Sequence, residues 1–291
     1  MDQIKNILHL MRIKHWSKNF FIYFPLIFSG QLFREGAFFQ ATFSLLGFCF
    51  LSSSIYILND LLDSENDKHH PHKSGRPLSR EAISRTFAIV LSLFFLIAGL
   101  CVCSLINFGV LLMGVLYILL HVVYNIYAKN VVILDVIFIA MGFQIRIWAG
   151  ALAIDVAPSV WLQMCVFVLA LFLGFVKRSL ELKFLKDSAQ KHRIVLSHYT
   201  SYLLDQIIII CSTLAIVFYG LYTISSDVVL KLGSYDMVYS VAFVIYGIFR
   251  YLYLAHVKRQ GDEPSDILFS DRPIFWCVFL WIVSIVWMIY F

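Results

Sequence analysis

Residues 37–67 read AFFQATFSLLGFCFLSSSIYILNDLLDSEND. Its first part, residues 37–58, is an apolar run long enough to cross a bilayer as a helix. The run leads directly into an acidic segment that contains Asp60, Asp63 and Asp67. Because these aspartates are three and four residues apart, a helix that continues through them places all three on one face. The stretch therefore predicts a membrane-spanning helix that ends in a cluster of carboxylates.

Such a cluster needs a cation. Three like charges on one helix face repel each other unless a positive group neutralises them. Oxygen ligands at an aqueous edge suit Mg²⁺, which keeps part of its water shell and shares the rest with substrate phosphates. The alternative is a solvated acidic loop, but ionisable residues at the membrane end of a helix are usually functional. We therefore predict that Asp60, Asp63 and Asp67 are catalytic and hold Mg²⁺ on a diphosphate.

The rest of the chain has the composition of an all-α integral membrane protein. Of its 291 residues, 60% are hydrophobic and only 14% are charged, and its mean hydropathy is +0.82. We expect a single transmembrane domain over residues 1–291, because no linker or repeat divides the chain. Windows long enough to span a bilayer predict nine helices. They lie near residues 19–34, 37–58, 83–104, 107–127, 131–153, 158–176, 204–225, 235–257 and 270–290.

The positive charges predict the orientation. With the N-terminus in the cytoplasm, 20 of the 23 lysines and arginines fall on the cytoplasmic side. This asymmetry is the pattern that the positive-inside rule describes. It predicts a multi-pass protein of the cell's inner (plasma) membrane, with its active site at the cytoplasmic side. A nucleic-acid partner is excluded, because the chain has no soluble basic domain.

Two segments are expected to lie outside the bilayer core. Residues 1–18 form an interfacial N-terminal segment, since apolar residues recur at helical spacing beside basic ones near its start. Residues 177–203 alternate apolar and charged groups, and we interpret them as a cytoplasmic loop that caps the site.

Basic residues follow the acidic segment closely. Arg76 suits bidentate contacts with phosphate, and Lys73 supplies a point charge, so both are candidate substrate-binding residues. Anchoring by positive-inside charge is the alternative. Three histidines lie nearby at positions 69, 70 and 72. Because Pro71 interrupts their spacing, we interpret them as a polar run at the interface and not as a metal site.

Two other basic groups are candidates for binding a phosphate. Lys14 and Lys18 flank an interfacial tryptophan, and the sequence leaves open whether they anchor the chain or bind an anionic headgroup. Lys177 and Arg178 follow the sixth predicted span. Here a simple i,i+4 pair between Lys177 and Glu181 is the alternative to a functional role.

A second polar group lies in the loop before residue 131. Tyr124 and Lys129 are candidate substrate-binding residues there. Asp135 lies about one turn inside the next predicted helix, so it must face protein or water, and we predict a catalytic role for it. Arg146 lies deeper in the same helix, where a structural contact within the bundle is the preferred interpretation.

Together these motifs resemble the UbiA superfamily of intramembrane prenyltransferases, and within it the decaprenyl-phosphate phosphoribosyltransferases. Members are all-helical and use Asp-bearing motifs to hold Mg²⁺ and a diphosphate beneath a lipid-facing tunnel. Ile13, His15 and the run Leu78-Ser79-Arg80 depart from the usual family pattern. The matching motifs are Arg12-x-Lys14-x-Trp16-x-Lys18-Asn19, Tyr56-x-x-Asn59-Asp60-x-x-Asp63-x-x-x-Asp67, His70-Pro71-x-Lys73-x-x-Arg76-Pro77, Lys129 through Asp135, Gly142-Phe143-x-x-Arg146-x-x-Ala149-Gly150-Ala151 and Lys177-Arg178-x-x-Glu181.

The resemblance implies an activity. It is the Mg²⁺-dependent transfer of 5-phosphoribose from phosphoribosyl diphosphate (PRPP) to a polyprenyl phosphate, with release of diphosphate, for synthesis of cell-envelope glycan precursors. Asn59 would then assist the three aspartates on the diphosphate, and Asp135 would complete that site. The resemblance also suggests a homo-oligomer such as a trimer. In support, the second polar loop has Lys129 and a lone Asp135, where a prenyl-diphosphate transferase needs a second strongly acidic motif.

Two other functions remain open at this point. One is transfer from a prenyl diphosphate to an aromatic or haem-like acceptor. The other is a transporter or flippase, although transporters usually place polar residues near the midplane on broken helices. This chain instead gathers its polar residues at one edge, which favours an enzyme.

Overall fold

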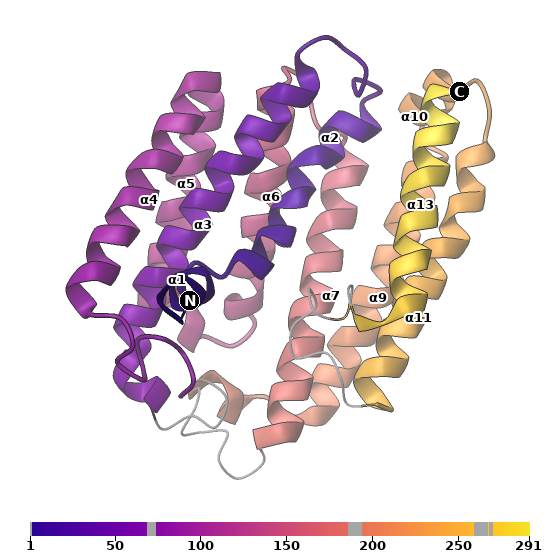
Figure 1. Cartoon of the computed structure of the whole chain (residues 1–291). Helices are drawn as coiled ribbons and strands as arrows, with labels where there is room; N and C mark the ends of the chain where they lie inside the picture. The colour runs from indigo at the N-terminus through magenta and orange to yellow at the C-terminus, as the bar shows by residue number, and fades with distance from the viewer. Residues whose placement is uncertain (1, 69–73, 186–193, 259–266, 268–269) are drawn as a thin grey trace. The chain divides into compact units, whose positions relative to one another are not determined.

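The computed structural model describes residues 2–68, 74–185, 194–258, 267 and 270–291, and in these parts every regular element is a helix (Figure 1). Eight helical segments there are long and apolar enough to cross a membrane, so the all-α membrane fold is confirmed, whereas the predicted count of nine is not. The segments are α3 (Ala37–Lys68), α4 (Arg85–Ile106), α5 (Phe108–Ile126), α6 (Leu134–Ala153), α7 (Val160–Leu185), α9 (Ser201–Thr223), η5 with α11 (Asp236–Ser240 and Val241–His256) and α13 (Arg272–Tyr290).

The N-terminal region accounts for the missing span. The predicted helix 19–34 is replaced by a 3-10 helix, η1 (Ile13–Ile22), which leads into a short α-helix, α2 (Tyr23–Phe28). Pro25 lies in the first turn of α2, where its missing N–H costs nothing. A helix, α1 (Asp2–Leu10), precedes them and confirms the predicted N-terminal helix, while its place at the membrane interface stays a prediction.

Side-chain caps set the start of several spans. Ser84 accepts a hydrogen bond from the N–H of Phe87, and Asn107 accepts one from Val110. Thr200 and Asp271 do the same for α9 and α13. Each cap satisfies a backbone donor that a helix leaves without a partner in its first turn.

Two helices extend beyond their predicted ends. α3 continues to Lys68, which confirms that the acidic segment is helical. α7 continues to Leu185, so the predicted loop 177–203 begins as helix. Its later part contains a short 3-10 helix, η4 (Ile194–His198), and residues 186–193 lie outside the described residues. The remaining short elements are η2 (Ala128–Asn130) and α10 (Ser226–Leu232).

The chain divides into two compact units, and the single domain predicted for residues 1–291 stays a prediction. The first unit contains residues 1–26, 31–128 and 145–157. In it α3 packs along α4, and α5 lies against both (Figure 1). Small residues permit this packing, because a Cβ added at Gly99 would lie 2.7 Å from Leu51 Cδ2. The buried core of this unit includes Phe48 and Tyr117, whose ring centroids are 5.4 Å apart.

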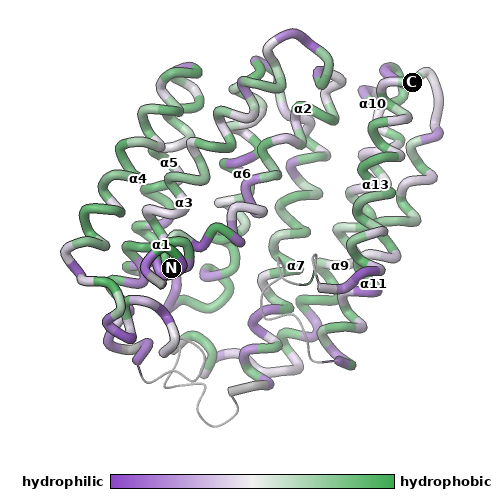
Figure 2. The backbone as a smooth tube through the Cα atoms, viewed as in Figure 1, coloured by the Kyte–Doolittle hydropathy of each residue, from purple (hydrophilic) through white to green (hydrophobic). Residues whose placement is uncertain are grey.

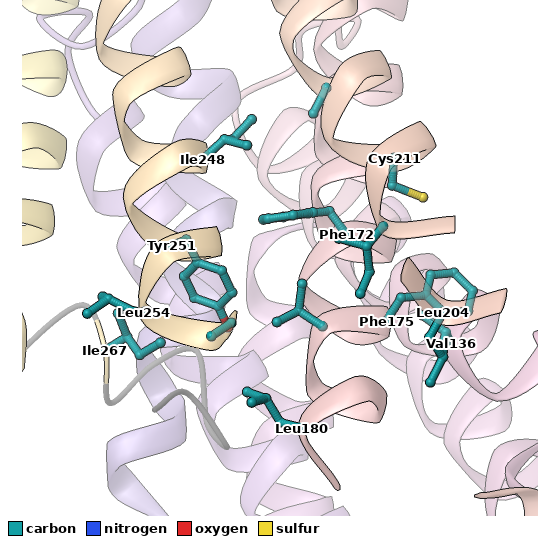
Figure 3. Packing of buried hydrophobic residues seen from close by; sticks show 14 of the residues in the cluster. Val136, Phe172, Phe175, Leu180, Leu204, Cys211, Ile248, Tyr251, Leu254 and Ile267 are labelled. Atoms are coloured by element: carbon teal, nitrogen blue, oxygen red, sulfur yellow. The ribbon is translucent and has the colours of Figure 1, made fainter. Parts of the chain in front are cut away.

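The second unit contains residues 27–30, 129–144 and 158–291. Its core is formed mainly by α7, α9 and α11, and Figure 3 shows Phe172, Phe175, Leu204 and Tyr251 within this cluster. Phe172 and Tyr251 meet edge to face with ring centroids 5.6 Å apart, a favourable geometry for aromatic pairs. The unit thus holds the start of α6 and the end of α7 in one packed core.

The hydropathy of the spans fits a membrane environment. Figure 2 shows hydrophobic residues along the spans, with hydrophilic residues gathered mainly near helix ends and in the connections. Helices satisfy their backbone hydrogen bonds internally, which is why they can cross a bilayer. The chain is therefore a multi-pass membrane protein, and its polar chemistry is concentrated at the ends of its helices.

Candidate functional site

Two buried carboxylates converge on one cation at the end of α3. Asp60 is 2% exposed and Asp67 is 4% exposed. Arg76 Nη1 lies 3.0 Å from Asp60 Oδ1 and 2.5 Å from Asp67 Oδ2. Asp63, on the same stretch of helix, is half-buried. Arg76, which the sequence predicts to bind phosphate, is therefore paired with both buried aspartates in this structure, and its substrate-binding role stays a prediction.

A second arginine reaches the same carboxylate. Arg12 Nη2 lies 2.5 Å from Asp60 Oδ1, and its guanidinium stands 5.0 Å above the centre of the Tyr56 ring. Arg12 directly precedes η1 as its N-cap, with a φ of 50° in the left-handed region that non-glycine residues seldom occupy. Arg12 belongs to one of the family-like motifs of the sequence, but it is not among the predicted substrate-binding residues. The signal that could have ranked it higher is its place beside Lys14 in that motif.

The donor set suits a divalent cation. Among the described residues, no three His, Cys, Asp or Glu side chains are grouped closely enough to hold a metal, and the buried aspartates are paired with guanidinium groups. However, the two buried carboxylates offer oxygen atoms to one cationic position, and oxygen is the ligand that Mg²⁺ prefers. The residues therefore fit Mg²⁺, and the metal-binding roles of Asp60, Asp63 and Asp67 stay predictions.

The other predicted residues of the first unit differ in exposure. Asn59, Lys18 and Tyr124 are half-buried, and Lys14 is exposed. Their substrate-binding roles stay predictions, as does that of Lys73, which lies outside the described residues.

The N-terminal segment is fixed on α3 by hydrogen bonds. Trp16 Nε1 donates to Ser53 Oγ at 3.0 Å, and Ser53 Oγ donates to the carbonyl of Met11 at 2.9 Å. Trp16 therefore contacts protein, in addition to any role as an interfacial anchor. These bonds hold the backbone on both sides of Arg12.

Arg146 makes the structural contact that the sequence favours. It is buried, its Nε donates to Asn19 Oδ1 at 2.7 Å, and its Nη2 donates to the Tyr117 hydroxyl at 2.8 Å. Asn19 in turn donates to Ser52 Oγ at 3.3 Å. Arg146 thus ties η1 to α3 and α5 within the first unit.

The second unit contains a separate buried ion pair. Asp135 is fully buried, and its Oδ2 accepts a hydrogen bond from Arg178 Nε at 2.6 Å. Arg178 is also buried, and its Nη1 lies 2.8 Å from Glu181 Oε2. In a buried ion pair of this kind, the carboxylate orients the guanidinium and the two opposite charges neutralise each other. The catalytic role of Asp135 and the substrate-binding role of Arg178 stay predictions. The observed contacts indicate that Asp135 holds the guanidinium of Arg178 in position.

Tyr199 is a member of this network that the sequence did not reveal. Its hydroxyl donates to Asp135 Oδ1 at 2.9 Å and accepts the backbone N–H of Ile133 at 2.6 Å. Burial, together with the nearby Asp135 carboxylate, raises the pKa of Tyr199, so the hydroxyl keeps its proton at neutral pH. No motif marks Tyr199, because its role depends on a contact across 64 residues. Lys129 and Lys177 lie in the same unit and are half-buried.

Known proteins share this chain's sequence and fold. The UbiA prenyltransferase family profile matches residues 23–263. Two relatives are named decaprenyl-phosphate phosphoribosyltransferase. The one from Mycolicibacterium smegmatis is 29% identical over 84% of this chain and 78% of the relative. The one from Corynebacterium glutamicum is 26% identical over 96% of this chain and 85% of the relative.

A solved structure shows the same fold. A UbiA homolog from Archaeoglobus fulgidus, bound to GPP and Mg²⁺, superposes with a TM-score of 0.71 at 18% identity and covers 98% of this chain and 99% of its own. The family match covers most of the chain and includes the aspartate-bearing helix α3. The chain therefore belongs to the UbiA prenyltransferase family and is a multi-pass membrane enzyme of that family.

Proposed function

We propose that this enzyme transfers 5-phosphoribose from PRPP to a polyprenyl phosphate. In this reaction the bond between the ribose C1 and the diphosphate breaks, and a bond forms between C1 and an oxygen of the lipid phosphate. Diphosphate leaves with the bonding electron pair. The names of the two bacterial relatives support this choice within the family.

The observation that carries the proposal is the convergence of two buried carboxylates and two arginines at the end of α3. Asp60 and Asp67 bring negative oxygens to one place, and Arg12 and Arg76 bring positive charge to the same place. A diphosphate with its divalent cation needs both, because the cation binds carboxylates and guanidinium groups bind phosphate oxygens. The arrangement therefore suits a leaving group that departs with a large negative charge.

Mg²⁺ would be held by Asp60, Asp63 and Asp67, with Asn59 beside them, and would supply neutralising charge to the leaving diphosphate. Arg12, Arg76 and Lys73 would bind the diphosphate oxygens or the 5-phosphate. No general base is needed, because the attacking lipid phosphate is already an anion at neutral pH. Catalysis then comes from positioning and from stabilisation of developing charge.

Other predicted residues are candidates for binding the remaining phosphates. Lys129 and Lys177 are candidates for the lipid phosphate or the 5-phosphate of the sugar, and Lys14, Lys18 and Tyr124 are candidates from the first unit. Arg178, held by Asp135, would contribute positive charge from a fixed position. The predicted loop 177–203 would cap the site.

The cell context follows from the charge distribution. We place the N-terminus and the site on the cytoplasmic side of the inner membrane, since 20 of the 23 lysines and arginines fall there and PRPP carries many negative charges. The lipid product would serve as a precursor for cell-envelope glycans. A homo-oligomer such as a trimer is part of the proposal.

A second candidate is transfer from a prenyl diphosphate to another acceptor. The observation that favours it is the solved UbiA homolog, which is bound to GPP and Mg²⁺. Separate assays with the two labelled donors distinguish the two functions. Purified protein in vesicles with polyprenyl phosphate and Mg²⁺ receives either ribose-labelled PRPP or a labelled prenyl diphosphate with an aromatic acceptor. Label from PRPP in the lipid phase supports the first function, and label only from the prenyl donor rejects it.

A transporter would behave differently in the same vesicles. Substrate accumulation that persists after Asp63→Ala, without any covalent product, would reject both transferase functions.

A further inference from the structure

Ile133 has an unfavourable backbone conformation at the start of α6. Its φ is 69°, in the left-handed region, and the next residue begins the helix. A β-branched side chain is a genuine outlier there, because its Cβ crowds the following carbonyl. Such a conformation persists only when surrounding contacts hold it.

The contacts that hold it centre on the hydroxyl of Tyr199. The N–H of Ile133 donates to this hydroxyl at 2.6 Å, and the hydroxyl donates to Asp135 Oδ1 at 2.9 Å. The other carboxylate oxygen, Oδ2, accepts from Arg178 Nε at 2.6 Å. All three side chains are buried, with Tyr199 4% exposed. One hydroxyl therefore acts as acceptor and donor between a strained backbone and a buried ion pair.

These bonds connect separate parts of the second unit. Tyr199 follows η4, Ile133 follows the turn that carries Lys129, and Arg178 lies near the end of α7. Burial raises the pKa of Tyr199, so its hydroxyl stays protonated and continues to donate. Phenylalanine at this position would fill the same space but make neither hydrogen bond.

We propose that Tyr199 is a positioning residue that keeps the turn before α6 in its strained conformation and so presents Lys129 to a phosphate monoester. This step rests on the proposed function, in which both the lipid phosphate and the 5-phosphate of PRPP are phosphate monoesters. Arg178 is aligned by the same bonds through Asp135. The proposed function assigns the diphosphate and Mg²⁺ to aspartates of the first unit, whereas the hydrogen bonds of Tyr199 lie within the second unit.

The test combines loss of the hydroxyl with relief of the strain. Tyr199→Phe removes both hydrogen bonds, and Ile133→Gly allows the left-handed conformation without help. Ile133→Val is the matched control, because valine is also β-branched and remains strained. Tyr202→Phe controls for loss of a tyrosine hydroxyl, since Tyr202 is exposed on α9. Each variant, including both double variants, is measured as full-length protein in detergent or vesicles.

Amide hydrogen exchange of residues 129–135 reports the conformation of the turn. We expect faster exchange in Tyr199→Phe, a return towards wild type when Ile133→Gly is added, and no return with Ile133→Val. Steady-state kinetics report the consequence. The KM for either polyprenyl phosphate or PRPP rises about tenfold in Tyr199→Phe, the change expected when Lys129 loses one hydrogen bond to its phosphate, and Ile133→Gly restores it. The substrate whose KM rises identifies which monoester Lys129 binds.

The proposal is overturned if Ile133→Gly rescues the exchange rate or the substrate KM no better than Ile133→Val. The exchange measurements need no activity. If the wild type transfers no phosphoribose, the proposed function fails while the rescue pattern in exchange still decides whether Tyr199 holds the turn.

Discussion

Arg12 lies 2.5 Å from the carboxylate of Asp60, although the two residues are 48 positions apart in the chain. The contact joins the N-terminal segment to the acidic end of α3. A buried carboxylate needs positive partners, and Asp60 has one from each side, Arg12 and Arg76. The N-terminal segment is therefore part of the candidate site and more than a membrane anchor.

Replacing Arg12 with alanine should weaken binding of the diphosphate donor. Loss of one charge-assisted hydrogen bond raises the donor KM about tenfold or more, whereas Arg12→Lys keeps the charge and loses less. Initial rates against donor concentration measure this change. Arg80→Ala is the control, because Arg80 bonds to Asn6 near the surface and contacts neither buried aspartate in the part of the chain described. An unchanged donor KM in Arg12→Ala would remove Arg12 from the site.

Replacing Asp67 with asparagine should reduce both turnover and Mg²⁺ affinity. The side chain keeps its shape but loses the charge that holds a cation, and the rate falls roughly 100-fold, at the upper end for a hydrogen bond to a charged group. Rates measured across a Mg²⁺ titration separate the two effects. Glu65→Gln should stay within about twofold of wild type, since exposed ion pairs such as that of Glu65 with Lys68 contribute little. An equal loss of turnover in Asp67→Asn and Glu65→Gln would contradict the proposed role of Asp67 in binding Mg²⁺.

Gly150 should not tolerate a side chain. A Cβ at this position would collide with the backbone carbonyl of Ile22, because α6 approaches η1 closely here within the first unit. Gly150→Ala should therefore destabilise the protein by about 1–3 kcal/mol, the usual cost of overpacking. Thermal unfolding in detergent measures this. Gly220→Ala is the matched variant, because no atom lies within 4 Å of its added Cβ, and it should be neutral or stabilising. Similar melting temperatures for both variants would show that the predicted collision is harmless.

Stability should depend on pH through Asp271. The hydrogen bonds from Arg250, at 2.8 Å for the closer nitrogen, lower the pKa of Asp271 below its usual value of 3.8. A lowered folded-state pKa stabilises the protein above the unfolded pKa, and this stabilisation is lost as pH falls through the folded value. The melting temperature of wild type should exceed that of Asp271→Asn at neutral pH, and the two should converge below about pH 4.

Asp271 also caps α13, so a control variant must separate the loss of the cap from the loss of the ion pair. Asparagine still caps α13, whereas Asp271→Ala also loses the bond to Ile274 N–H, worth about 1 kcal/mol. A difference between wild type and Asp271→Asn that is the same at pH 7 and pH 3 would show that the ion pair with Arg250 contributes nothing.

Much of the fold was predictable because hydropathy has a direct structural meaning in a membrane. Apolar runs predicted each of the eight spans, and the spacing of Asp60, Asp63 and Asp67 correctly predicted a continuous helix. The first predicted span is a 3-10 helix followed by a short α-helix and not one long α-helix, because hydropathy does not distinguish these two forms of an apolar segment. α7 is longer than predicted, because its last turns are polar, and an apolar run marks only the part of a helix that can lie in the membrane.

The contacts of the site were less predictable, because they depend on tertiary structure. The sequence marks Arg76 as a candidate because it follows the aspartates closely, and the structure places its guanidinium beside Asp60 and Asp67. It gave no reason to pair Arg178 with Asp135, which is 43 residues away, or to notice Tyr199. The strain at Ile133 is equally invisible, because a β-branched residue is the last one expected to have a positive φ.

We propose that the acidic end of α3 binds the diphosphate of PRPP while a lipid phosphate displaces it. Mass spectrometry of lipids after incubation with polyprenyl phosphate, PRPP and Mg²⁺ tests this proposal. We expect a lipid heavier by one phosphoribosyl group, one diphosphate released for each lipid converted, and neither product from Asp60→Asn. An unchanged lipid from the wild-type enzyme, in a preparation that transfers a prenyl group from a prenyl diphosphate, would contradict it.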